Sequence, residues 1–290
     1  MIQLASRDAT ARRPVITYFL LVFAISYGAF IVVVGPRLLH GGTETAADAE
    51  YILFPVLVVG VFIVSLTMTG RLYGSSGIRR LLAREARWEV NPGWYLIALL
   101  LCPAVLLAVI LTLAWLVSPV FRPNDFVLGI SFAVMPGFLE EFGWTGFAYP
   151  HMRRTLSPFR AAVLLGILWG LWHAPVVDYL GAAAPHGEYW LPFFLAFIAV
   201  VSAVRVLIVW VYSRTGSLLL CQLMHLSSTG SLVMLDPVRV SPAQETLWYA
   251  LYGAALWLIA AIWVRPRLRD SNAPPIRDEQ RVVQADVQPL

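Results

Sequence analysis

Apolar residues occur along this chain in long runs that are separated by short polar segments. The runs cover residues 14–35, 51–70, 93–118, 126–149, 158–180, 189–212, 216–235 and 246–264. An α-helix rises about 1.5 Å per residue, so about 20 apolar residues are enough to cross the hydrocarbon core of a bilayer. The pattern therefore predicts an all-α fold, a polytopic membrane bundle of eight transmembrane helices.

The composition fits a membrane protein better than a soluble one. Of the 290 residues, 59% are hydrophobic and 13% are charged, with a mean hydropathy of +0.73, whereas a soluble domain has about 25% charged residues. The net charge is +4, and the arginines lie in short loops between the apolar runs. We therefore expect a lipid bilayer as partner and no nucleic acid. Cys102 and Cys221 lie inside apolar runs and are too few for a disulfide framework or a cysteine-based zinc site.

The loops alternate in charge. Arginines concentrate before the first run, in the loops after the second, fourth and sixth runs, and after the eighth, while the remaining loops hold most of the acidic residues. By the positive-inside rule this predicts a multi-pass protein of the cell membrane with cytoplasmic N- and C-termini. An even number of helices agrees with that topology.

Two segments fall outside the spans. Residues 75–90 combine apolar side chains with several arginines, which predicts a short amphipathic helix on the cytoplasmic membrane surface. The polar composition of residues 266–290 predicts a disordered cytoplasmic tail. We therefore expect one transmembrane domain over residues 1–265, followed by this tail.

Two adjacent carboxylates, Glu140 and Glu141, lie in the middle of the fourth apolar run. Each acidic residue at a helix centre costs about 2.5–3.5 kcal/mol on insertion scales, so we expect the pair to face a polar cavity. His173 and His225 lie in the fifth and seventh runs, with Trp169 and Thr229 four residues away on the same helix faces. A carboxylate with two imidazoles can activate water by binding a metal or by direct general-base action.

These residues also resemble a known family. Glu-Glu-Phe-Gly-Trp-Thr-Gly-Phe at 140–147, Trp-Gly-Leu-Trp-His-Ala-Pro at 169–175 and the later His225 are similar to the three motifs of the CPBP intramembrane proteases. That family includes the type II CAAX prenyl endopeptidases and the Abi bacteriocin-immunity proteins. The resemblance covers a motif core at residues 126–235, and the family's core also has eight helices.

The resemblance implies a role for each site residue. Glu140 would be the catalytic carboxylate, His173 its partner in polarising water, and Glu141 the supporting carboxylate. His225, assisted by Thr229, would stabilise the oxyanion. The cofactor is left open: either Zn²⁺ bound by Glu140, His173 and His225, or no metal. The chain has no His-Glu-x-x-His sequence, which weakens the usual zinc-protease picture.

Two positions depart from the family's motifs. Thr145 stands where the first motif has Arg, and Thr229 where the third has Asn. Without a cation beside them, Glu140 and Glu141 should share a proton. Arg205, in the sixth run, could replace the missing cation or could extend to the cytoplasmic interface. We expect Trp144, Phe147 and Trp172 to be packing residues, and Gly143, Gly146 and Gly170 to permit close helix contacts.

The sequence thus predicts an intramembrane endopeptidase that uses Glu- and His-activated water to cleave membrane-associated peptides or proteins, or hydrophobic C-terminal segments. One alternative is a catalytically silent relative that acts as a scaffold or immunity protein, which the two threonines favour. Another is a proton-coupled transporter with Glu140 and Glu141 as a relay. The sequence shows no internal repeat and no paired broken helices, which argues against transport.

Overall fold

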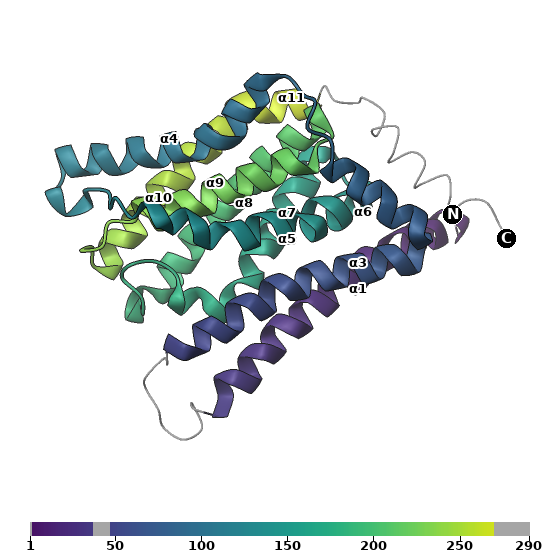
Figure 1. The fold of residues 1–290 in the computed structure, drawn as a ribbon, viewed down its shortest axis with the longest axis horizontal. Helices are drawn as coiled ribbons and strands as arrows, with labels where there is room; N and C mark the ends of the chain where they lie inside the picture. The colour runs from purple at the N-terminus through teal and green to yellow at the C-terminus, as the bar shows by residue number, and fades with distance from the viewer. Residues whose placement is uncertain (1, 37–46, 270–290) are drawn as a thin grey trace.

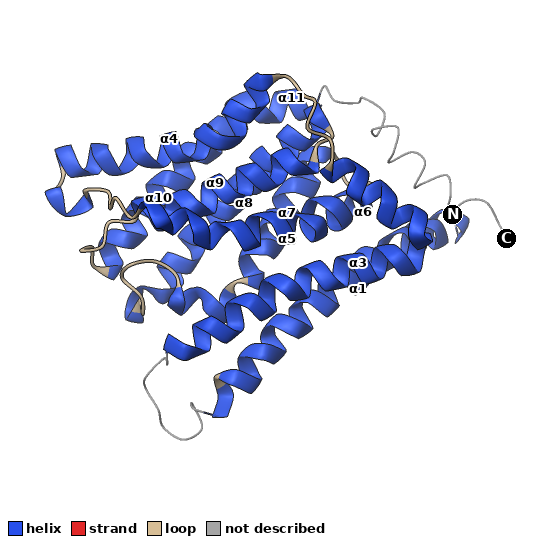
Figure 2. Cartoon of the chain, in the orientation of Figure 1, coloured by secondary structure: helices blue, strands red, loops and turns tan. Residues whose placement is uncertain are grey.

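A computed structural model describes residues 2–36 and 47–269 of the chain, and the regular secondary structure of these residues is entirely helical (Figure 2). This confirms the all-α prediction. The elements in order are α1 (Ile2–Val33), α3 (Ala47–Glu85), α4 (Pro92–Leu116), η1 (Pro119–Phe121), η2 (Val127–Ala133), α5 (Val134–Gly143), η3 (Trp144–Ala148), α6 (Tyr149–Met152), α7 (Pro158–Trp172), η4 (Ala174–Tyr179), η5 (Gly187–Tyr189), α8 (Trp190–Thr215), α9 (Leu218–Leu235), α10 (Pro242–Ile259), η6 (Ala260–Val264) and α11 (Arg265–Arg269).

Six helical segments among the described residues are long and apolar enough to cross a bilayer. They are Arg13–Val33, Ile52–Glu85, Pro92–Leu116, Gly187–Thr215, Leu218–Leu235 and Pro242–Leu268, and the apolar Pro158–Trp172 is shorter. Large apolar side chains such as Leu20 and Trp115 remain exposed on the outer helices, as contact with lipid requires. The chain is a multi-pass membrane protein.

The helices surround α8. In its apolar stretch 83% of the residues are buried, against 17% in that of α1. It packs against α7, α9 and α10. Helices α1 and α3 form an antiparallel pair along one side, with α4 on the opposite side of the molecule (Figure 1). The short helix α5, which bears both glutamates, packs between α3 and α9.

Two glycines one turn apart bring α7 unusually close to α8. A Cβ atom added to Gly166 would lie 2.5 Å from the Cα atom of Ser202, and one added to Gly170 would lie 2.9 Å from a side-chain atom of Ile198. Glycines spaced in this way let membrane helices approach closely, which confirms the expectation for Gly170. The approach sets the α8 residue Arg205 directly beside α7.

The fourth and fifth expected spans are not continuous α-helices, which corrects the prediction from the apolar runs. The fourth begins as the 3₁₀-helix η2, continues as α5 and passes into the π-helical turn η3. Pro136 lies in the first turn of α5, where its missing N–H breaks no helical hydrogen bond. The fifth leaves α-helical geometry after Trp172, close to Pro175, because proline disfavours helical geometry in the residue before it. The sequence shows no sign of broken helices, and this counts as an argument against transport. Because two of the apolar runs are interrupted, that argument no longer applies.

Hydrogen bonds gather the basic loops at one end of the bundle. Ser217 donates to the carbonyl of Arg87 at 2.6 Å, and Arg214 donates to the carbonyl of Arg267 at 3.1 Å. The acidic loops meet elsewhere, where the backbone N–H of Ala182 donates to Asp236 at 2.9 Å. This grouping agrees with the predicted topology, in which the basic loops share one side of the membrane.

The two segments outside the expected spans join the helices next to them. The surface helix expected at 75–90 continues α3 beyond a break at Gly74, whose φ of 61° is left-handed, and it buries Leu81. At the other end of the chain, α11 extends to Arg269, past the expected domain boundary at 265. The rest of the predicted tail, residues 270–290, lies outside the described residues.

Candidate active site

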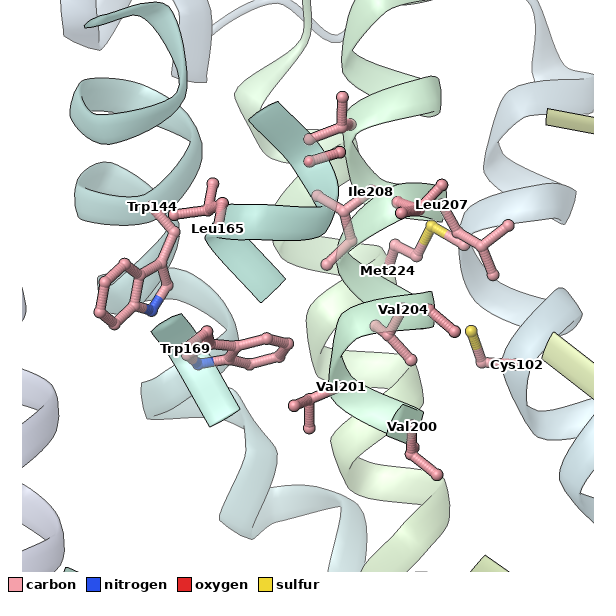
Figure 3. Packing of buried hydrophobic residues seen from close by; sticks show 14 of the residues in the cluster. Cys102, Trp144, Leu165, Trp169, Val200, Val201, Val204, Leu207, Ile208 and Met224 are labelled. Carbon is pink, nitrogen blue, oxygen red and sulfur yellow. The ribbon is translucent and has the colours of Figure 1, made fainter. Parts of the chain in front are cut away.

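Glu140 is buried at the C-terminal half of α5, where two tryptophans bind one of its carboxylate oxygens. The indole N–H groups of Trp144 and Trp169 donate to its Oε2 atom at 2.8 and 2.9 Å. Trp144 comes from the turn that follows Glu140, and Trp169 comes from α7. Trp144 is fully buried in the core, as expected of a packing residue, and its N–H in addition fixes the carboxylate. In the view of Figure 3, Trp169 lies between Trp144 and the buried α8 residues Val201 and Val204.

Glu141 is fully buried and lies at the centre of a polar network. Its Oε2 atom accepts from Arg205 at 2.8 Å and from the Thr145 hydroxyl at 2.5 Å, while its Oε1 atom accepts from Nδ1 of His225 at 2.9 Å. The side chains of Arg205 and Glu141 are both 0% exposed. A buried carboxylate needs such a charge partner and further hydrogen bonds to offset its lost hydration.

Arg205 is the cation that the first motif lacks. Its guanidinium lies in the core of the bundle, and its Nη1 atom also donates to Thr145 at 3.2 Å. It therefore does not extend to the interface. Of the two roles that the sequence left open for Arg205, the structure shows the first, because α8 places its guanidinium beside Glu141.

His173 ends α7 and is held in one orientation by its own helix. Its Nδ1 atom is 2.8 Å from the carbonyl oxygen of Trp169. A carbonyl oxygen can only accept, so Nδ1 has the hydrogen and Nε2 of the neutral ring has the free lone pair. The rings of Trp172 and Phe197 contact His173 edge-on, with centroids 4.7 and 5.1 Å away.

His225 is buried on α9 and is oriented by Glu141. Because a carboxylate accepts, Nδ1 of His225 donates to it, and Nε2 is the ring atom left for other partners. Thr229 lies one turn further along α9 and is half-buried. Among the described residues, no hydrogen bond joins its side chain to the other four site residues, so its role in the site stays a prediction.

Trp169 lies next to Glu140, Arg205 and both histidines. Besides its bond to Glu140, its ring lies 4.9 Å from that of His225 and 5.7 Å from that of His173, and the guanidinium of Arg205 lies 4.3 Å from its centroid. Residues from α5, α7, α8 and α9 thus meet around one indole. The expectation that Glu140, Glu141, His173 and His225 come together from three separate spans is confirmed.

The residues present do not form a metal-binding set. Over residues 2–36 and 47–269, no group of three or more His, Cys, Asp or Glu side chains is placed to hold a metal ion. Glu140, His173 and His225, the predicted zinc ligands, are therefore not such a group, and the choice between Zn²⁺ and no metal stays a prediction.

Sequence reasoning overlooked the hydrogen-bonding role of two residues. Trp144 lies four positions after Glu140, the spacing that brings side chains together on a helix, so this contact could have been anticipated. Gln222 donates to the carbonyl of Phe138 at 3.1 Å and ties α9 to α5 beside the glutamates. No local sequence pattern predicts this contact between Gln222 and Phe138.

Comparison with known proteins identifies the central part of the chain. Residues 122–230 match the family described as type II CAAX prenyl endopeptidase Rce1-like. This segment contains Glu140, Glu141, His173 and His225 and extends through most of α9. Over this segment the chain is similar to that family.

A curated relative agrees with the assignment. The chain is 37% identical over 54 residues to a CAAX prenyl protease 2 of Methanococcus maripaludis. The aligned part is 19% of this chain and spans only 20% of the length of that relative. Both matches name the prenyl-endopeptidase branch, and they confirm the resemblance to the CPBP proteases.

Proposed function

We propose that this protein is an intramembrane endopeptidase that hydrolyses peptide bonds in membrane-associated peptides or proteins, near hydrophobic C-terminal segments. The observation that carries the proposal is the buried cluster in which Trp169 contacts Glu140, His173 and His225. The family match over residues 122–230 supports it. The site is set among apolar helices, where a low local dielectric strengthens each electrostatic interaction.

In the proposed mechanism, Glu140 and His173 position a water molecule between them. The Glu140 carboxylate takes one proton from the water, while the lone pair on Nε2 of His173 accepts the other O–H and orients the oxygen. The resulting hydroxide attacks the scissile carbonyl carbon and forms a tetrahedral oxyanion. Glu140 then gives its proton to the leaving amine nitrogen as the C–N bond breaks.

His225 stabilises the oxyanion. Because Glu141 holds Nδ1 of His225, the proposed contact with the developing negative oxygen is made by Nε2, which donates to it as Nε2–H. Thr229 would add its hydroxyl from the next turn of α9. Removal of one oxyanion donor in other hydrolases costs about 10²–10³ in kcat.

The proposal is tested with purified protein in proteoliposomes and an internally quenched hydrophobic peptide. We expect cleavage by the wild type, and its loss in Glu140→Gln and in His173→Ala. Glu140→Gln keeps an oxygen that can accept from both tryptophans, so the fold should survive. Glu188→Gln, which changes an exposed glutamate in η5, serves as the matched control and should cleave normally. Equal cleavage by Glu140→Gln and the wild type would refute the mechanism.

The two alternatives predict different results in the same vesicles. A silent scaffold would cleave nothing. In cells, the Glu140→Gln variant would then protect as well as the wild type does. A proton-coupled carrier would accumulate solute without cleavage. The arginine bound to Glu141 removes one of the two departures that favoured a silent relative, so the endopeptidase is the better-supported function.

A further inference from the structure

The charge partner of Glu141 comes from a different helix than the family's first motif implies. In that motif the arginine stands four residues after the second glutamate, one turn along the same helix. This chain has Thr145 at that position, and the arginine bound to Glu141 is residue 205, on α8. The two parts of this ion pair are 64 positions apart in the chain.

The local packing makes this relocation possible. Gly166 lets α7 approach α8 so closely that an added Cβ atom would lie 3.1 Å from the Cβ of Arg205. Thr145 is short enough to leave room for the guanidinium, and its hydroxyl bridges Arg205 and Glu141. The small side chain at 145 and the large one at 205 therefore complement each other.

Only one nitrogen of the guanidinium takes part. Among the described residues, Nη1 makes the hydrogen bonds to Glu141 and Thr145, whereas Nε and Nη2 are buried without a hydrogen-bond partner. A single charged donor at this place is thus sufficient for the contact. The flat face of the guanidinium rests on Trp169, which in turn donates to Glu140.

We propose that Arg205 is the positioning residue of this site and replaces the cation of the first motif from α8. By occupying Oε2 of Glu141, it keeps this carboxylate ionised and leaves Oε1 to orient His225 through Nδ1. It does not touch the substrate or the water; it acts through Glu141. The activity part of this inference rests on the proposed peptidase function.

The test moves the cation back to the position of the motif. The variants are Arg205→Met, Arg205→Lys, Thr145→Arg and the double variant Thr145→Arg/Arg205→Met, with the exposed Arg214→Met on the same helix as control. Arg205→Met should lower kcat by about 10- to 100-fold, as expected for a lost hydrogen bond to a charged group. Arg205→Lys and the double variant should recover part of the loss. Thr145→Arg alone should also lower activity, because it sets a second cation beside Arg205 in a fully buried place.

Rescue separates positioning from simple packing. If Arg205 only filled space, Met would replace it well, and adding Arg at 145 to Arg205→Met would bring further harm. Either full activity of Arg205→Met or a double variant less active than Arg205→Met overturns the inference.

Thermal unfolding in detergent tests the ion pair independently of activity. We expect Arg205→Met and Glu141→Gln to have strongly non-additive effects on the midpoint, and Thr145→Arg to raise the midpoint of Arg205→Met. If the wild type cleaves no peptide, the proposed function fails while this measurement still decides the pairing. Additive effects in the unfolding cycle would refute the ion pair itself.

Discussion

The indole N–H of Trp169 donates to Oε2 of Glu140 over 2.9 Å, although the two residues lie 29 positions apart on different helices. The main-chain carbonyl of the same tryptophan accepts from Nδ1 of His173 at 2.8 Å. One residue therefore sets the orientation of both groups that the proposed mechanism uses to activate water. Any change in its side chain should alter the carboxylate while the histidine keeps its backbone bond.

Replacing Trp169 with Phe should reduce peptide cleavage by about 10- to 100-fold, because it removes one hydrogen bond to a charged group and keeps an aromatic ring. The effect should appear in kcat more than in KM, since the carboxylate acts on the water. Steady-state kinetics with the quenched peptide measure both constants.

Trp257→Phe is the matched control for this change. Its indole also donates one hydrogen bond, at 2.9 Å, but to the carbonyl of Ala199 on α8, away from Glu140. If Trp257→Phe and Trp169→Phe lower kcat equally, the loss reflects general weakening of the bundle and the role assigned to Trp169 is wrong.

A second prediction concerns the close contact of α7 and α8. Gly166→Ala should destabilise the protein by about 1–3 kcal/mol, the usual cost of overpacking, because the new Cβ atom would meet the main chain of Ser202. It should also displace Arg205 from Glu141 and reduce cleavage. Gly70→Ala, where no atom lies within 4 Å of the added carbon, should unfold at or above the wild-type temperature. Equal melting temperatures for both variants would contradict the packing argument.

The sequence predicted where the helices lie better than it predicted whether each apolar run forms one unbroken helix. Apolar length alone finds a membrane segment, and the helices around α8 follow the expected runs closely. Apolar length could not show that the run at 126–149 divides into a 3₁₀-helix, a short α-helix and a π-turn. All three pieces are similarly apolar, so composition does not distinguish them. Pro136 and Pro175 were the visible signs that two runs would be interrupted.

The site was predictable where motifs are local and not where contacts are distant. Glu140, His173 and His225 were found because intramembrane titratable groups are costly and stand out in an apolar run. The pairing of Arg205 with Glu141 depends on how α8 rotates and on how closely Gly166 lets it approach. Neither property can be deduced from one sequence, so the sequence left open whether Arg205 replaces the cation missing at Thr145 or extends to the interface.

A third prediction concerns metal. Among the described residues no group of three or more His, Cys, Asp or Glu side chains is placed to hold a metal ion, so we expect a strong chelator to leave the rate of peptide cleavage unchanged. The measurement compares chelator-treated enzyme with the same sample after addition of Zn²⁺. Loss of cleavage that only added zinc restores would show that Glu140, His173 and His225 rearrange into a ligand set.

A fourth prediction concerns the acidic loops, which lie away from the basic ones. There Glu245 and Asp236 hold the loop between α7 and α8. Glu245 accepts from the backbone N–H groups of Ala182 and Ala183 at 2.9 and 3.0 Å and lies 3.0 Å from Nε2 of His186, a loop residue that the sequence left without a role. Asp236 accepts from Ala182 as well. Burial, and then the nearby Glu245 carboxylate, raise the pKa of Asp236 from 3.8 to about 8.

This raised pKa sets the direction of the pH dependence. Between about pH 4 and 8, folded Asp236 retains a proton that the unfolded chain releases, so its contribution to the free energy of unfolding falls as the pH rises through this window and levels off above about 8. Asp236→Asn removes the titrating group and keeps an acceptor for Ala182, so its melting temperature should fall less steeply with pH than that of the wild type. The measurement is thermal unfolding in detergent across this window for both proteins. Parallel curves for the two would mean that the carboxyl group of Asp236 does not titrate there, and that the loop is held without a shared proton between Asp236 and Glu245.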